Sequence, residues 1–212
     1  MESREKLSGP AANDYFGWSI SLSTNGDRVA VGAPLDGERT DPGYVRTYLF
    51  TGINDEWTQL GQQLSNGESR DRYGYSVSMD GTGNRVAVGA FRGTNGLGAV
   101  TGNARVYRVR GQVWDSLGEI ITGESESSNF GYSVSLTIEG DFLAVGAPNQ
   151  GNNPGTGMAK VFALTDSASW VSSAPITTNV EQASLGFSVS LTSFAERLAV
   201  GMPPANEARV YE

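Results

Sequence analysis

The chain has 212 residues and a formal net charge of −8, from 15 Lys and Arg against 23 Asp and Glu. It contains neither Cys nor His, which excludes disulfides, zinc–thiolate sites and nucleophilic sites that need a thiol or an imidazole. The negative charge argues against nucleic acid as a partner, because binding to phosphates depends largely on Lys and Arg. No apolar stretch approaches the roughly 18 residues that span a bilayer, and the first residues are charged, so neither membrane insertion nor a signal peptide is expected.

One pattern occurs four times along the chain. The repeats begin at Asp14, Asp71, Ser128 and Ser184, and a glycine in their second half recurs in steps of 57, 57 and 55 residues, at Gly32, Gly89, Gly146 and Gly201. Repetition at such a period indicates a chain built from equivalent structural units.

Each repeat predicts a series of short strands. The first strand alternates Ser with an apolar residue, which is the period of extended chain, at residues 19–22, 76–79, 133–136 and 188–191. A hairpin of constant length leads to a second strand of small and branched residues, at 29–33 in the first repeat. The third strand ends in a basic–X–aromatic stretch, and a fourth strand in the first three repeats contains Trp57, Trp114 or Trp170.

Repeated four-stranded antiparallel units with an aromatic signature are typical of β-propeller blades. We therefore predict an all-β fold, a β-propeller of four four-stranded antiparallel blades in a single domain over residues 1–212. The predicted blade repeats span about 14–70, 71–127, 128–183, and 184–212 together with 1–13.

The fourth repeat ends without a fourth strand and without a Trp. Residues 4–9 correspond in position to residues 61–66, which precede the second repeat. The N-terminal strand is therefore predicted to complete the last blade and to close the ring, leaving no exposed strand edge. The competing geometry is an open half-ring that pairs with a second copy, because four blades is the low end of the range of about 4–8.

The two motifs of each repeat resemble the FG-GAP repeat, which builds the β-propeller of integrin alpha subunits. The aromatic–Gly motif stands at Phe16-Gly17, Tyr73-Gly74 and Phe130-Gly131, with Leu185-Gly186 departing, and Gly-Ala-Pro stands at residues 32–34 and 146–148, with 89–91 and 201–203 departing. The resemblance implies a propeller with an adhesive or binding role at the cell surface or outside the cell.

Calcium-binding members of this family carry a longer Asp-rich loop between the two motifs, because calcium takes six to eight oxygen ligands. The same interval here is a short hairpin in each repeat. No cofactor is therefore expected, and the usual calcium site is predicted to be missing. We interpret Asp27, Asp141 and Glu196 as turn residues.

Several repeated side chains have a structural interpretation beside a functional one. The repeated Trp could stack on sugars, but a blade-packing role is favoured. Trp18 occupies the repeat position of Tyr75, Tyr132 and Phe187 and is predicted to be one of four plug residues. The recurring basic residues could line a groove, but solvated or cross-strand paired charges are favoured at Arg46, Arg105, Lys160 and Arg209.

The connections between the second and third strands vary in length, while the hairpins between the first two strands do not. Recognition is usually placed on variable loops of a constant scaffold. The predicted binding residues on this face are Asp36, Glu38, Arg39, Asp41, Glu68, Arg70, Asp71, Arg92, Glu124 and Glu126. Ordinary loop polarity is the alternative explanation for this set.

Without His, Cys or a Gly-rich phosphate loop, no catalysis is predicted, although a carboxylate pair such as Asp36 and Glu68 could still converge. The predicted function is a non-catalytic binding or adhesion module, monomeric or a subunit of an assembly, whose variable loops meet a protein partner. A lectin that binds a glycan through Tyr15, Tyr44 and Tyr73 is one alternative. A purely architectural subunit is the other.

Overall fold

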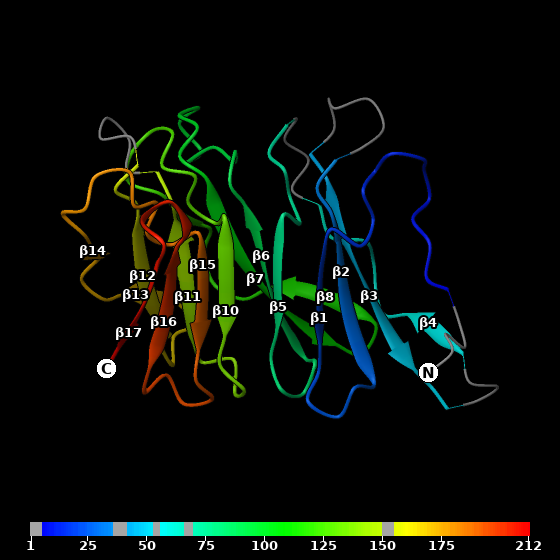
Figure 1. Cartoon of the computed structure of the whole chain (residues 1–212). Helices are drawn as coiled ribbons and strands as arrows, with labels where there is room; N and C mark the ends of the chain where they lie inside the picture. Colours follow the sequence, from blue (N-terminus) through cyan, green and yellow to red (C-terminus); the bar gives the residue numbers. More distant parts are fainter. Residues whose placement is uncertain (1–5, 36–41, 53–55, 66–69, 150–154) are drawn as a thin grey trace.

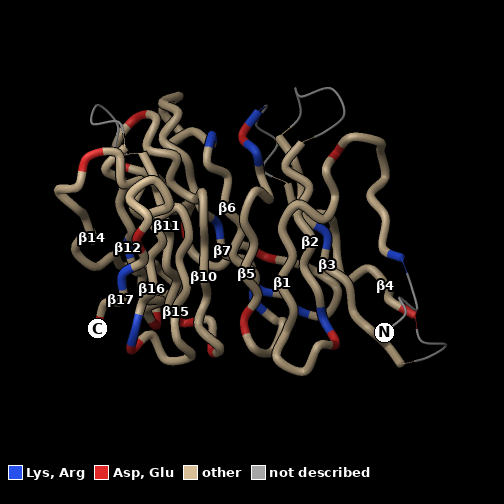
Figure 2. The backbone as a smooth tube through the Cα atoms, viewed as in Figure 1, with Lys and Arg blue, Asp and Glu red and all other residues tan. Residues whose placement is uncertain are grey.

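The structure, a computed structural model, describes residues 6–35, 42–52, 56–65, 70–149 and 155–212. Four small antiparallel sheets, one from each repeat, are arranged as a four-bladed β-propeller (Figure 1). The innermost strands contact one another in the order β1, β5, β10 and β15. These strands contain no charged residue, as the tan tube along them in Figure 2 shows.

The first three blades share one strand order. The first contains β1 (Ser19–Leu22), β2 (Arg28–Ala33), β3 (Tyr44–Phe50) and β4 (Trp57–Gln59). The second contains β5 (Ser76–Met79), β6 (Arg85–Ala90), β7 (Asn103–Arg110) and β8 (Val113–Ser116), and β9 (Ile121–Thr122) also pairs with β7. The third contains β10 (Ser133–Leu136), β11 (Phe142–Ala147), β12 (Met158–Leu164) and β13 (Trp170–Ser172), and β14 (Ile176–Thr177) also pairs with β12.

The fourth blade has three strands among the described residues, namely β15 (Ser188–Leu191), β16 (Leu198–Met202) and β17 (Glu207–Tyr211). A short 3-10 turn, η1 (Pro203–Ala205), connects β16 to β17. No helix in the described ranges is long and apolar enough to cross a membrane.

The hairpin between the first two strands is closed by a side chain in every blade. The residue after the first strand accepts a hydrogen bond from the backbone N–H five positions later, over 3.0–3.1 Å, at Ser23, Asp80, Thr137 and Thr192. Such Ser, Thr and Asp side chains stabilise tight turns. This local bond explains why the hairpin keeps a constant length.

The hydrophobic core lies between blades and not within them, because a single sheet has no second layer of its own. One cluster joins Val45 and Leu64 before the second blade to Val86, Val88 and Trp114 within it. Similar clusters join the second blade to the third and the third to the fourth. Each blade is therefore stabilised mainly by its neighbours.

The ring closure predicted from the sequence is not observed. Residues 1–5 lie outside the described residues, and Leu7 packs against Val29, Val31 and Tyr48 of the first blade, not against β17. In Figure 1 the described N-terminal segment and β17 lie at opposite sides of the molecule. The alignment of repeats identified which strand the fourth blade lacks, but an alignment does not specify which sheet that strand joins.

Candidate functional site

An aromatic row follows the inner edge of the propeller across all four blades. The ring centroids are 5.4 Å apart for Trp18 and Tyr75, 4.8 Å for Tyr75 and Tyr132, and 5.0 Å for Tyr132 and Phe187. Each of these residues immediately precedes the first strand of its blade. The equivalence predicted for Trp18 is confirmed, although the four rings form an open row in which Trp18 is 51% exposed.

A cleft of about 350 Å³ opens beside this row, between the variable loops of the first two blades. Pro34 and Leu35 follow β2, and Phe91 and Arg92 follow β6, so each pair begins one variable loop. We call this space the loop cleft, which is lined by Trp18, Pro34, Leu35, Arg72, Tyr75, Phe91 and Arg92.

The loop cleft combines an aromatic wall with two cations. The guanidinium of Arg92 lies 5.9 Å from the centre of the Phe91 ring, a distance that suits a cation–π contact. Arg92 is exposed and Arg72 is partly buried. A guanidinium presents a planar set of donors that fits a carboxylate. The cleft is therefore suited to a ligand that carries an anionic group beside an apolar or aromatic one.

The third aromatic residue of the cleft also has a hydroxyl. Burial and a hydrogen bond with Tyr132 raise the pKa of Tyr75 well above its usual value near 10. The hydroxyl therefore stays protonated at neutral pH. It can take part in hydrogen bonds, but it does not supply an anion for the cleft.

The structure places the predicted binding residues in different surroundings, and part of the set lies outside the described residues. Asp36, Glu38, Arg39, Asp41 and Glu68 lie outside the described residues. Arg70 and Glu126 are exposed, and Arg92 lines the loop cleft. Of the predicted set, the described part of the structure therefore places Arg92 alone in the cleft.

Two of the predicted binding carboxylates, Asp71 and Glu124, are held by contacts within the protein: Asp71 is buried and Glu124 is ion-paired. Asp71 is only 2% exposed, so it is not available to a partner on the surface. Its repeat equivalent Asp14 accepts hydrogen bonds from the Phe16 N–H at 3.0 Å and from the Tyr44 hydroxyl. Glu124 forms an ion pair with Lys160, whose side chain is largely buried. The prediction that both acids contribute to a binding face is wrong for Asp71, because its side chain is buried.

Sequence reasoning did not select Arg72, Tyr75 or Phe91 as binding residues. One signal could have identified Phe91, since the second repeat has Gly-Ala-Phe where the first and third have Gly-Ala-Pro. The Phe91 ring lies 4.5 Å from that of Tyr75 and extends the aromatic wall. The alternation of strand directions predicts that the connections carrying Arg72 and Arg92 emerge on one face, and the fold brings both residues to one cleft.

The repeated Trp residues have the packing role that was favoured, Trp114 and Trp170 between blades and the half-buried Trp57 within the first blade. Trp114 and Trp170 are 3% and 6% exposed, so neither can stack on a sugar. The indole of Trp170 donates to the carbonyl oxygen of Leu117 in the preceding blade at 2.8 Å. Tyr44 and Tyr73 are also buried, which removes them from the predicted glycan site and leaves Tyr15 exposed.

Three of the four recurring basic residues and two of the turn acids follow their structural interpretations, whereas the Nε atom of Arg105 is buried without a hydrogen-bond partner among the described residues. Arg46 donates to Gln63 at 2.9 Å and Arg209 to Glu207 at 2.9 Å, in addition to the Lys160–Glu124 ion pair. Within their hairpins, Asp27 and Asp141 accept hydrogen bonds from Ser23 and Thr137 at 3.0 Å and 2.6 Å. Within the described ranges, no three carboxylates are grouped so that they could hold a metal ion.

Comparison in sequence identifies one family. Residues 7–50 and 63–107, which cover most of the first two repeats, match the FG-GAP repeat family. No curated protein matches the chain.

Comparison of structures finds solved structures of similar fold and low sequence identity. Hydrazine synthase of Kuenenia stuttgartiensis matches 90% of this chain and 51% of its own, with a TM-score of 0.60 and 13% identity. A protein described as a candidate 6-phosphogluconolactonase of Bacteroides uniformis matches 97% of this chain and 55% of its own, with a TM-score of 0.64 and 9% identity. The periplasmic gluconolactonase of Pseudomonas aeruginosa matches 82% and 46%, with a TM-score of 0.52 and 16% identity.

This chain thus spans about half the length of the structures that it matches. At identities of 9–16% the likeness concerns the fold alone.

Proposed function

Starting from a chain whose first two blades are FG-GAP repeats, we propose that it is a non-catalytic binding module that presents the variable loops of one propeller face to a protein partner. Adhesion at the cell surface, as the likeness to integrin alpha propellers suggests, belongs to the same proposal. The propeller fold alone is not evidence for this function, because propellers serve many functions.

The loop cleft is the observation that carries the proposal. It lies between two variable loops, and it offers the exposed Trp18 and the half-buried Phe91 together with the guanidinium of Arg92. Aromatic residues and Arg are enriched at the energetic centres of protein interfaces. A partner segment that places an acidic residue beside an aromatic or aliphatic one would match both the charge and the apolar wall.

The non-catalytic part of the proposal rests on the groups that the cleft contains. The chain has no His or Cys, and the raised pKa of Tyr75 keeps its hydroxyl neutral at physiological pH. Arg72 and Arg92 remain cationic, so they bind anions but do not transfer protons. The described cleft residues therefore provide recognition without a general base.

A random peptide library displayed on phage tests the proposal. Selection on the folded protein should enrich peptides in which Asp or Glu stands near an aromatic or aliphatic residue. Binding of the selected peptides, measured by titration calorimetry, should weaken at least about tenfold for Arg92→Glu and for Trp18→Ala, as for central interface residues. It should also weaken as the salt concentration rises.

The matched control is Arg110→Glu, which makes the same charge change at an exposed residue. Arg110 ends β7 at the opposite face of the propeller from the loop cleft. This variant should bind the peptides as the unaltered protein does. Peptides without an acidic residue, or equal binding by all variants, would contradict the proposal.

A lectin is the second candidate function, and one specific observation favours it. Tyr15 and Trp18 are both about half exposed, with ring centroids 6.1 Å apart. Exposed aromatic faces suit the apolar faces of sugars. Glycan-array binding that Trp18→Ala abolishes and Arg92→Glu leaves unchanged would favour this function over the protein partner.

A further inference from the structure

The same junction occurs three times between successive blades. In each, a Ser hydroxyl of one inner strand donates to the carbonyl oxygen of a glycine in the next blade. The donor–acceptor pairs are Ser19 and Gly74 at 2.8 Å, Ser76 and Gly131 at 2.9 Å, and Ser133 and Gly186 at 2.9 Å. The junction is therefore a repeated feature of the sequence, with a fixed set of donors and acceptors.

A second set of bonds runs the other way across the same junctions. The backbone N–H at the end of each following inner strand donates to a Ser hydroxyl of the preceding blade. These pairs are Met79 and Ser21 at 2.9 Å, Leu136 and Ser78 at 2.9 Å, and Leu191 and Ser135 at 3.0 Å. Each Ser-X-Ser strand thus uses both hydroxyls to hold the next blade.

Among the described residues, no blade lies on the donor face of the fourth blade. Ser188 and Ser190 occupy the positions of Ser133 and Ser135, and both are exposed. A Cβ built on Gly32, Gly89 or Gly146 would lie 2.0–2.1 Å from a carbonyl oxygen of the next blade, whereas one built on Gly201 would meet only Ser188. The fourth blade therefore has a glycine where its equivalents leave room for the carbonyl oxygen of a next blade, but among the described residues no carbonyl oxygen lies near it.

The first blade carries the matching acceptor face. Gly17 and Leu22 occupy the positions of Gly74 and Met79. Leu22 is 56% exposed, whereas its equivalents Met79 and Leu136 are 6% and 7% exposed under the preceding blade. The inner strand β1 carries no charged residue, as its tan colour in Figure 2 shows, and its Leu22 is left exposed.

The N-terminal segment lies as though a further blade preceded the first one. Leu7 packs on Val29 and Val31, as Leu64 packs on Val86 and Val88. A Cβ on Gly9 would meet Phe16 Cβ at 2.8 Å, and one on Gly123 would meet Phe130 Cβ at the same 2.8 Å.

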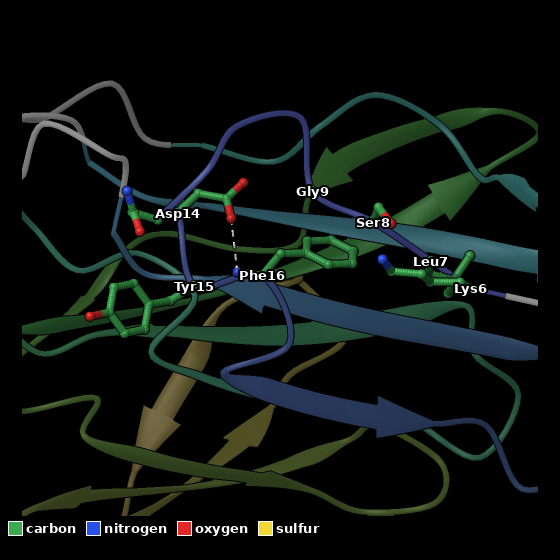
Figure 3. Close-up of a pocket in the computed structure, with 8 residues that line it drawn as sticks. Lys6, Leu7, Ser8, Gly9, Asp14, Tyr15 and Phe16 are labelled. Atoms are coloured by element: carbon green, nitrogen blue, oxygen red, sulfur yellow. Dashed lines mark hydrogen bonds between the residues drawn. The ribbon is translucent and has the colours of Figure 1, made fainter. Parts of the chain in front are cut away.

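An open space remains beside this segment. A hollow of about 420 Å³ is lined by Ser8 and Phe16 among others. Figure 3 shows the residues around it. At the next junction, Gly43 fills this space, where it accepts a hydrogen bond from Ser65 at 3.2 Å and pairs with Tyr73. The hollow therefore corresponds to the position that the residue before the third strand of a preceding blade would occupy.

We infer that the free face of the fourth blade docks on the free face of the first blade of a second copy, so that two chains form a closed ring of eight blades. Ser188 then donates to the Gly17 carbonyl, and the Leu22 N–H donates to Ser190. Leu7 pairs with Ala208, as Leu64 pairs with Val45. The second copy is the chosen occupant because it necessarily carries both complementary faces.

Two-fold symmetry makes the two junctions identical and leaves no face open, so the assembly stops at two chains. Eight blades is within the observed range of about 4–8. The same outer strand that was predicted from the sequence to complete the last blade is thereby supplied by the partner chain.

Asn206 would clash if the junction between two chains had the same geometry as the junctions within one chain. Asn206 has a φ of 55° and occupies the position of Gly43, Gly102 and Gly157. A Cβ at those glycines would lie 2.1–2.4 Å from a carbonyl oxygen of the next blade, so the start of β17 must shift slightly when the copies dock. Asn206→Gly removes this Cβ and should tighten the association.

Sedimentation analysis over a range of protein concentrations tests the inference. The protein should be a dimer that dissociates on dilution. Leu22→Asp, which places a charge on the exposed acceptor face, should raise the dissociation constant at least about tenfold. Asn206→Gly should lower it, and Leu97→Asp, at a site 92% exposed on a loop, should leave it unchanged. A monomer at all concentrations, or assemblies beyond two chains, would overturn the inference.

Engineered cysteines give an independent readout, since the natural chain has none. Leu22→Cys with Ser190→Cys should form disulfides between two chains under mild oxidation. Ser21→Cys with Met79→Cys, the equivalent pair inside the molecule, should form one within each chain and provides the control. A disulfide between Cys at 22 and 190 within one chain would show that four blades close on themselves and would overturn the two-chain ring.

Discussion

The indole N–H of Trp114 donates a hydrogen bond to the carbonyl oxygen of Leu60 at 3.0 Å and so links the outer strand of the second blade to the first. The same N–H lies 2.8 Å from the hydroxyl oxygen of Thr47. The repeated Trp is therefore both an apolar filler between blades and a polar link between them. Its recurrence at blade period reflects this double role.

Trp114→Phe should lower the free energy of unfolding by about 1–3 kcal/mol, because it removes a buried hydrogen-bond donor and part of the ring. Urea denaturation followed by circular dichroism measures this loss. Trp18→Phe is the matched control, since Trp18 is 51% exposed, and its effect should stay within about 0.5 kcal/mol. Equal losses in the two variants would contradict the packing role.

Gly61→Ala should destabilise the protein more than Gly111→Ala. Both glycines have positive φ, 72° and 64°, so both substitutions strain the backbone by about 1–2 kcal/mol. A Cβ on Gly61 would also lie 2.7 Å from the indole of Trp114, while the space around Gly111 is open. Thermal unfolding of the two variants separates the interblade contact from the backbone strain. A smaller loss for Gly61→Ala would show that the blades adjust to the added methyl group.

The stability should fall as the pH rises above about 10. Burial raises the pKa of Tyr44, Tyr73 and Tyr75, and a hydrogen bond to Asp14 raises that of Tyr44 further. Above the unfolded pKa the unfolded chain loses these protons while the folded one keeps them, so unfolding becomes more favourable. The contribution is complete below that pH and is lost as the pH rises toward the folded values.

Urea denaturation between about pH 9 and pH 11 measures this dependence. Tyr44→Phe should make the fall in the free energy of unfolding less steep, because one of the three groups no longer titrates. An equally steep fall in the variant would show that other groups cause the pH dependence.

The local features of the fold could be predicted from the sequence. The first strands of all four blades have the predicted bounds, and the second strand of the first blade begins one residue earlier than expected, at Arg28. Alternation of Ser with apolar residues and the turn chemistry of Asp27 and Asp141 act between neighbours in the chain, so they are readable without a structure.

The candidate site depended on the tertiary structure. The loop cleft joins Trp18 and Leu35 of one repeat to their equivalents Tyr75 and Arg92 of the next. The repeat period relates these positions, but only the fold shows that they line one cleft. Likewise, the sequence shows Asp71 as one charged loop residue among others, and only the fold shows that it is buried.

The sequence by itself determined the repeat, the blade strands and the FG-GAP family of the first two repeats, because these depend on periodicity within about 57 residues. The tertiary structure decided how the two ends of the array are arranged. Leu7 could have joined β17 or remained beside the first blade, and the same sequence pattern is compatible with both. The contact of Leu7 with Val29 and Val31 settles its position, because removing apolar surface from water stabilises whichever contact the fold makes, and the sequence pattern does not specify that contact.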